Sequence, residues 1–263
     1  MSEDEIMVFI VSAGLAVFGA AKYRTGRLPG LVRRDNPGLG LIRLAVLAGM
    51  GWLVYVLARH ADPSVQGVYN VFYLVMGYAA LQCFGKGGAH LFGAHARIDA
   101  GERKNWAAAL FVAGFTLGTG LIFGASLWGE ADPTGDGEGG WWIPLGFFLL
   151  GWSVMAGGLT LYCWREPGSF RKRIRQERDA GTALGAASFA ISASVLMVSA
   201  VSGDFWGWTH GLKDVMLAAG LLIVHEFIHL PDRLTDRIPA LRWIESGIYF
   251  GVVAVNLLIQ WLR

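Results

Sequence analysis

Charge and cysteine are both scarce in this chain. Only 16% of the 263 residues are charged and 54% are apolar, which is more apolar surface than a soluble domain of this length could bury in one core. Two cysteines, Cys83 and Cys163, are too few for a disulfide framework. A net charge of +2 gives no indication of nucleic-acid binding. The chain also has no P-loop, no Rossmann fingerprint and no Cys-x-x-Cys, so we expect its apolar surface to face lipid.

Long apolar runs account for that surface. A bilayer core takes roughly 20 apolar residues per helix. Eight runs of that kind are found at 5–22, 39–59, 66–85, 105–128, 141–163, 181–202, 211–231 and 239–262. The sequence therefore predicts an all-α, polytopic membrane helix bundle with eight transmembrane helices.

The distribution of charge predicts how those helices are oriented. Acidic residues precede the first run and basic residues follow it, the reverse of a cleavable signal peptide, so we expect this run to remain as an anchor. Basic clusters then occupy every second connection, and the positive-inside rule assigns those connections to the cytoplasm. Their members include Lys22, Arg33, Arg34, Lys86, Arg97, Arg103, Arg171, Lys172, Arg173, Arg175, Arg233, Arg237 and Arg242. The connection at 129–140 is acidic instead. We therefore predict a multi-pass protein of a bacterial inner (plasma) membrane with both termini outside, in the periplasm.

An internal repeat divides the chain. When 105–129 is laid over 179–203, Ala109 pairs with Ala183 and Phe115 with Phe189, and the same offset places Gly151 over Gly77. We therefore predict a single membrane domain built from an anchor helix and basic loop (1–38) and three parallel two-helix repeats. These repeats are 39–104, 105–178 and 179–263. Parallel units differ from the inverted pairs of many secondary transporters.

The segment 97–203 contains a polar turn with Asn105, an Ala-rich helix with the step Ala113-Gly114, and a weaker repetition of both. In these features it resembles the DUF350 (YjfL-like) family of bacterial multi-pass inner-membrane proteins. In that repetition Asp179 replaces the turn Asn and Ser188 replaces the Gly. The resemblance implies a multi-pass inner-membrane protein of uncharacterised biochemistry, and it supplies no catalytic residues.

One motif carries recognisable chemistry. The string His225-Glu226-Phe227-Ile228-His229 matches H-E-x-x-H, in which the two histidines bind zinc and the glutamate activates water. Ionisable side chains at membrane depth are functional hypotheses by default. We therefore assign His225 and His229 as candidate metal ligands and Glu226 as the candidate catalytic residue. Glu245 is a candidate third ligand.

Three alternatives for this motif stay open. One is a non-catalytic metal or proton-relay role for the same residues. His90 and His95 are predicted on the same side of the membrane, so a wider histidine cluster is conceivable. The motif could instead be structural, with its side chains bonded to neighbouring helices or to arginines at the membrane edge such as Arg242. The pair Arg242 and Glu245, spaced i,i+3, is predicted to be an interfacial ion pair.

These observations lead to two hypotheses of function. The first is a non-enzymatic, channel-like or envelope-associated assembly component, because the chain has little mass outside the membrane to hold chemistry. Its partners would be lipid and either further copies of itself or other membrane proteins, with no cofactor and no nucleic acid. The second is an intramembrane zinc metallopeptidase or hydrolase that uses His225, Glu226 and His229.

Overall fold

A computed structural model describes residues 1–24, 36–62, 65–129, 140–166, 168–202, 208–229 and 240–262. Within these ranges the chain forms helices and their connections and no strand. The basic connections at 25–35 and 230–239 and the acidic one at 130–139, on which the predicted orientation partly rests, lie outside the described residues.

Eight long helical segments make up the described structure. They are α1 (Glu3–Lys22), α2 (Pro37–Arg59), α3 (Val68–Ala80), α4 (Trp106–Ala125), α5 (Trp142–Arg165), α7 (Ala180–Val201), α8 (Trp208–Ile228) and α10 (Ala240–Trp261). Seven described segments are long and apolar enough to cross a membrane: α1, α2, α4, α5, α7, α10, and α3 together with its continuation to Phe92. The chain is thus a helical, multi-pass membrane protein. The predicted boundaries agree within a few residues except at α3, where π-helical η1 (Leu81–Lys86) and 3-10 helical η2 (Gly88–Phe92) continue the helix to Phe92.

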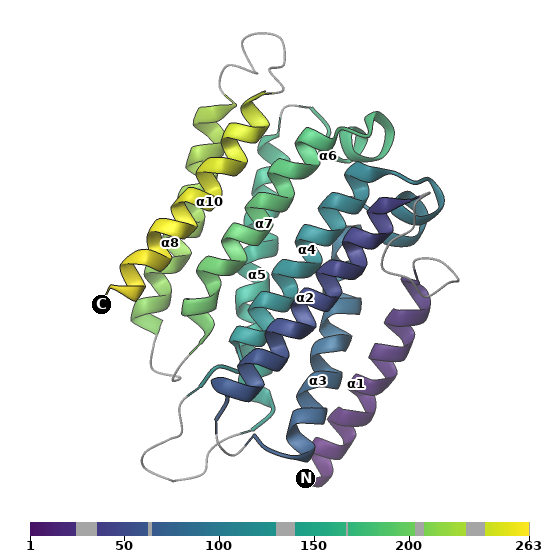
Figure 1. Cartoon of the computed structure of the whole chain (residues 1–263), viewed down its shortest axis with the longest axis vertical. Coiled ribbons are helices and arrows are strands. Elements are labelled where there is room, and N and C mark those ends of the chain that lie inside the picture. The colour runs from purple at the N-terminus through teal and green to yellow at the C-terminus, as the bar shows by residue number, and fades with distance from the viewer. Residues whose placement is uncertain are drawn as a thin grey trace.

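The helices form two layers. In one layer α2, α4, α7 and α10 lie side by side in that order, and in the other α1 packs on α3 and α5 packs on α8 (Figure 1). Phe84 of η1 joins the two halves of the second layer through edge contacts with Phe148 and Trp152 of α5. The most buried spans are α4 and α7, which occupy the middle of the first layer.

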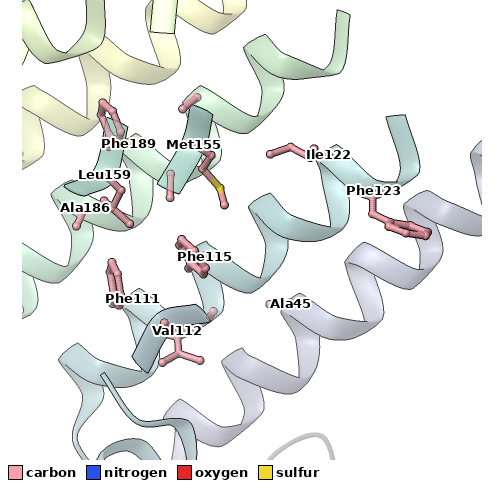
Figure 2. Packing of buried hydrophobic residues seen from close by; sticks show 14 of the residues in the cluster. Ala45, Phe111, Val112, Phe115, Ile122, Phe123, Met155, Leu159, Ala186 and Phe189 are labelled. Carbon is pink, nitrogen blue, oxygen red and sulfur yellow. The ribbon is translucent and has the colours of Figure 1, made fainter. Parts of the chain in front are cut away.

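Small residues allow the central helices to approach closely. A Cβ added to Gly114 of α4 would lie 2.6 Å from the Cβ of Ala187 on α7, and one added to Gly120 would lie 2.9 Å from the Cα of Gly49 on α2. Larger side chains fill the space beside these contacts, and Figure 2 shows Phe111 of α4 pointing toward the side where α5 and α7 lie. Such small-residue contacts are typical of membrane helix packing.

Three polar caps define one end of the bundle. The residues before α2, α4 and α7 are Asn36, Asn105 and Asp179. The side-chain amide of Asn36 donates a 2.8 Å hydrogen bond to the carbonyl of Ala100, in the turn before Asn105. In the same way the amide of Asn105 donates a 2.8 Å hydrogen bond to the carbonyl of Ile174, in the turn before Asp179. These three helices therefore begin side by side and run parallel. We call this end of the bundle the N-cap end.

The connections that lead to two of these caps are alike. π-helical η3 (Ala96–Glu102) precedes α4, and the short α6 (Phe170–Lys172) with π-helical η4 (Arg173–Glu177) precedes α7. The backbone N–H of Asn105 donates to the carbonyl of Asp99, and that of Asp179 donates to the carbonyl of Arg173 at the same six-residue spacing. The range 179–263 holds three long helices, however, because α10 follows α7 and α8. This helix is additional to the two-helix pattern expected there.

Candidate metal centre

The two histidines of the H-E-x-x-H motif meet a carboxylate from α10. His225 and His229 are four residues apart and so share one face at the end of α8. His225 Nδ1 lies 2.9 Å from Glu245 Oε1, and His229 Nε2 lies 2.9 Å from Glu245 Oε2. All three side chains are fully buried, and one ligand atom from each falls within 4.8 Å of the others. The candidate third ligand named from sequence is therefore brought to the histidine pair.

Arginines and a second glutamate surround this group. Arg242 Nη1 lies 2.9 Å from His229 Nε2 and 3.3 Å from Glu245 Oε2. The same guanidinium pairs with Glu166, which follows α5, and Glu166 also pairs with Arg173 of η4. Arg242 and Glu245 do form the predicted i,i+3 pair, but at 5% and 0% exposure it is buried in this network.

Tyrosines and a glycine close the cluster. The hydroxyl of Tyr249 donates a 2.7 Å hydrogen bond to Glu245 Oε1, and the ring of Tyr162 lies 4.1 Å from that of His225. Gly185 of α7 faces the same point, where an added Cβ would lie 2.6 Å from the Tyr162 hydroxyl and 2.8 Å from Glu245 Oε2. Four helices, α5, α7, α8 and α10, therefore contribute to one buried polar site at the N-cap end.

Glu226, the candidate catalytic residue, lies outside this group. Its carboxylate pairs with both Nε and Nη2 of Arg165 at the end of α5, the second contact being 2.7 Å. The two side chains are 31% and 45% exposed, whereas the histidines are fully buried. The glutamate that would activate water is thus held by another partner.

His90 and His95 form a separate pair. Their rings lie 4.1 Å apart, and Tyr23 makes an edge contact with His90. Among the described residues, the group of ligand atoms at His225, His229 and Glu245 does not include them.

The hydrogen bonds within the site leave two inconsistencies. His225 Nε2 is buried with no hydrogen-bond partner, and a carboxylate oxygen of Glu166 is 4.0 Å away. His229 Nε2 faces both a carboxylate oxygen, which needs a proton from it, and an Arg242 N–H, which needs its lone pair. One nitrogen cannot satisfy both. A cation bound by the two histidines and Glu245 would replace the proton between His229 and Glu245. It would also use the His229 lone pair, so Arg242 would have to turn fully to Glu166.

The ligand chemistry fits zinc. Two imidazoles and one carboxylate form a known zinc ligand set. Bonds of about 2.1 Å in a tetrahedron separate ligand atoms by about 3.4 Å. The two 2.9 Å contacts would therefore have to widen, and the 4.8 Å spread of the group would have to close, for all three residues to surround one ion. His225 Nε2, on the far side of its ring, would then face Glu166, as metal-bound histidines commonly face an outer carboxylate.

The sequence did not indicate all of the site. Glu166, Arg173, Tyr162 and Tyr249 carry no spacing motif, and Arg173 belongs to a basic run predicted to be a cytoplasmic orientation signal. The one signal for Glu166 is that it is an acid in a connection that is mostly basic.

Comparisons of the chain with family models, with curated proteins and with solved structures found no match. The assignment of the site therefore depends on its geometry.

Proposed function

We propose that this chain is an integral inner-membrane protein that holds a divalent transition metal, best matched by zinc, at His225, His229 and Glu245. The observation that carries the proposal is the arrival of Glu245, 16 and 20 residues from the two histidines, at hydrogen-bond distance from both. The nitrogen and oxygen ligands suit zinc better than magnesium or calcium, which take oxygen ligands.

The role we propose for the metal is non-enzymatic. His225, His229 and Glu245 are fully buried, and Arg242 lies where a catalytic site would keep an open position for water. Glu226 is engaged by Arg165. The metal would then join α8 to α10, which suits a membrane assembly component that associates with itself or with other membrane proteins.

Zinc-dependent hydrolysis is the second candidate. Its specific support is that Glu245 completes the two-histidine, one-glutamate set used by zinc peptidases. Catalysis would require Glu226 to leave Arg165 and turn to the metal.

We further propose that α8 is the eighth membrane span and that both termini are outside, in the periplasm. Contacts of α8 with α5, α7 and α10 along the bundle support the first statement. Two hydrogen bonds support the position of the termini. Trp141, before α5, donates one to Asp4, and Gln260 donates one to Ser199 near the end of α7, so each terminus lies opposite the N-cap end. Membership of the DUF350 family stays a proposal that depends on the Asn105 turn and the Ala-Gly step.

Metal analysis tests the proposal. The full chain, purified in detergent and dialysed against trace zinc, should hold about one zinc per chain by mass spectrometry. His225→Ala with His229→Ala should remove the zinc, Glu245→Gln should weaken binding, and the control His90→Ala should retain it. Chelation should lower the thermal midpoint of the wild type and leave that of the double variant unchanged. Wild-type protein without zinc, or a double variant that still binds it, would refute the proposal.

The variant Glu226→Gln separates the two candidate functions. A non-enzymatic centre predicts full zinc content and no proteolysis of an unfolded reporter protein by either wild type or variant. Zinc-dependent cleavage that is present in wild type and absent in Glu226→Gln would establish hydrolysis instead.

A further inference from the structure

A basic recess lies at the N-cap end, apart from the metal centre. It has a volume of about 450 Å³ and is lined by Arg103, Ser169, Arg171, Lys172, Arg175 and Gln176. Arg103 comes from the connection before α4 and the others from the connection before α7. Four of the six lining side chains are cationic and none is acidic. Arg173, in the same basic run, is instead buried and paired with Glu166.

A buried carboxylate holds two cations of this recess, and a third packs against a glycine. Asp99 is fully buried, and its carboxylate pairs with Arg103 at 3.2 Å and with Arg175 at 3.2 Å. Arg171 lies against Gly93, where an added Cβ would be 2.6 Å from both Cγ and Nε of the arginine. Gly93 has a φ of +89°, which a glycine adopts without strain. These side chains therefore lose less conformational freedom on binding an anion than free surface arginines would.

The recess retains positive charge after these pairs are counted. The carboxylate of Asp99 pairs with both Arg103 and Arg175, and that of Glu177 lies 3.8 Å from Lys172. Four cations thus face two acids, and both acids lie outside the lining. Guanidinium groups match phosphate oxygens with two parallel hydrogen bonds, so the recess is suited to phosphate.

The position of the recess favours a lipid phosphate. Trp106 opens α4 and is 44% exposed, and Trp164 lies at the end of α5 and is 75% exposed. Exposed tryptophans at the ends of spans mark the level of the lipid headgroups. We propose that this recess binds a phosphate-bearing anion, supplied by the headgroup of an anionic phospholipid. This site is independent of the proposed metal centre, because the two have no residue in common.

Lipid binding to the full chain tests the proposal. Native mass spectrometry from detergent should show phosphatidylglycerol bound in preference to phosphatidylcholine. Removal of one headgroup-level cation should weaken binding about fivefold. We therefore expect Arg171→Gln to bind phosphatidylglycerol about fivefold more weakly. Arg97→Gln is the matched control, because Arg97 is 61% exposed, pairs with Glu102 and lies outside the recess.

A titration with inorganic phosphate distinguishes the two sources of the anion. Preferential phosphatidylglycerol binding that falls in Arg171→Gln and not in Arg97→Gln supports the lipid as the source. Inorganic phosphate that binds below millimolar concentration and is lost in Arg171→Gln supports the anion site with a soluble source. Binding of neither probe, or equal weakening by both substitutions, overturns the proposal. Both arginines are exposed, and an unchanged thermal midpoint would verify that each variant is folded.

Discussion

The carboxylate of Glu166 serves two guanidinium groups, and its removal is the sharpest test of the buried network. Glu166→Leu would leave Arg173 and Arg242, which are 4% and 5% exposed, without their common counter-ion. Breaking a buried ion pair by removing one partner costs about 3–5 kcal/mol. Because this substitution breaks two pairs, we expect the free energy of unfolding to fall by at least about 4 kcal/mol.

Removal of one arginine as well should restore part of that stability. In Glu166→Leu/Arg242→Leu only Arg173 remains of the three charges, and it keeps its 3.3 Å pair with Asp179. Glu245 also loses Arg242, but it keeps its hydrogen bonds with His225, His229 and Tyr249. Replacing both members of a buried pair by apolar groups is often close to neutral. The double variant should therefore be more stable than Glu166→Leu alone, which is the opposite of additive behaviour.

Reversible unfolding in mixed micelles, followed by far-UV circular dichroism with chelator present, measures these differences. Glu102→Gln is the control, because its pair with Arg97 is 61% exposed on both sides and should contribute less than about 1 kcal/mol. If Glu166→Leu is no more destabilising than this control, or if the double variant loses the sum of both single effects, the network is not the source of stability described here.

Two further predictions concern helix packing and helix capping. Gly114→Leu should lower the free energy of unfolding by about 1–3 kcal/mol, because its Cβ would meet Ala187 at 2.6 Å. Gly157→Leu, where an added Cβ meets nothing within 4 Å, should be neutral or slightly stabilising in the same assay. Burial raises the pKa of Asp179, but hydrogen bonds donated by the Thr182 N–H and hydroxyl, together with the charges of Arg173 and Arg242, outweigh it and hold that pKa below its ordinary value. This stabilisation is present above about pH 4 and is lost as the pH falls through the folded-state pKa. Asp179→Asn should therefore reduce the fall of the unfolding midpoint at acidic pH. An unchanged fall of the midpoint in this variant would contradict the assignment.

Helix positions followed from the sequence because lipid and helix length impose a simple rule. The run 105–128 became α4 at Trp106–Ala125 and the run 39–59 became α2 at Pro37–Arg59. The end of α3 did not follow, since Gly85, Gly87 and Gly88 suggest a break in the helix. There η1 and η2 continue the helix as π-helical and 3-10 helical turns.

The site was predictable only where its residues recur at helical spacing. His225 and His229 form an i,i+4 pattern, and Glu245 could be placed at a similar depth on the last helix. Glu166 and Arg242 are 76 residues apart and meet only because α5 and α10 end and begin at the same end of the bundle. No local pattern encodes that meeting. The direction of Glu226 toward Arg165 likewise depends on how α8 rotates against α5.

The dependence of α8 on α10 has a consequence for biogenesis. α8 carries Lys213, Asp214 and Glu226 along its length, and it ends in two buried histidines. Their partners, Arg242 and Glu245, are synthesised later. Bringing such groups into the bilayer unpaired is costly. The last two helices should therefore leave the insertion machinery together as a hairpin, and a chain truncated before α10 should leave α8 unanchored and accessible to quality-control proteases.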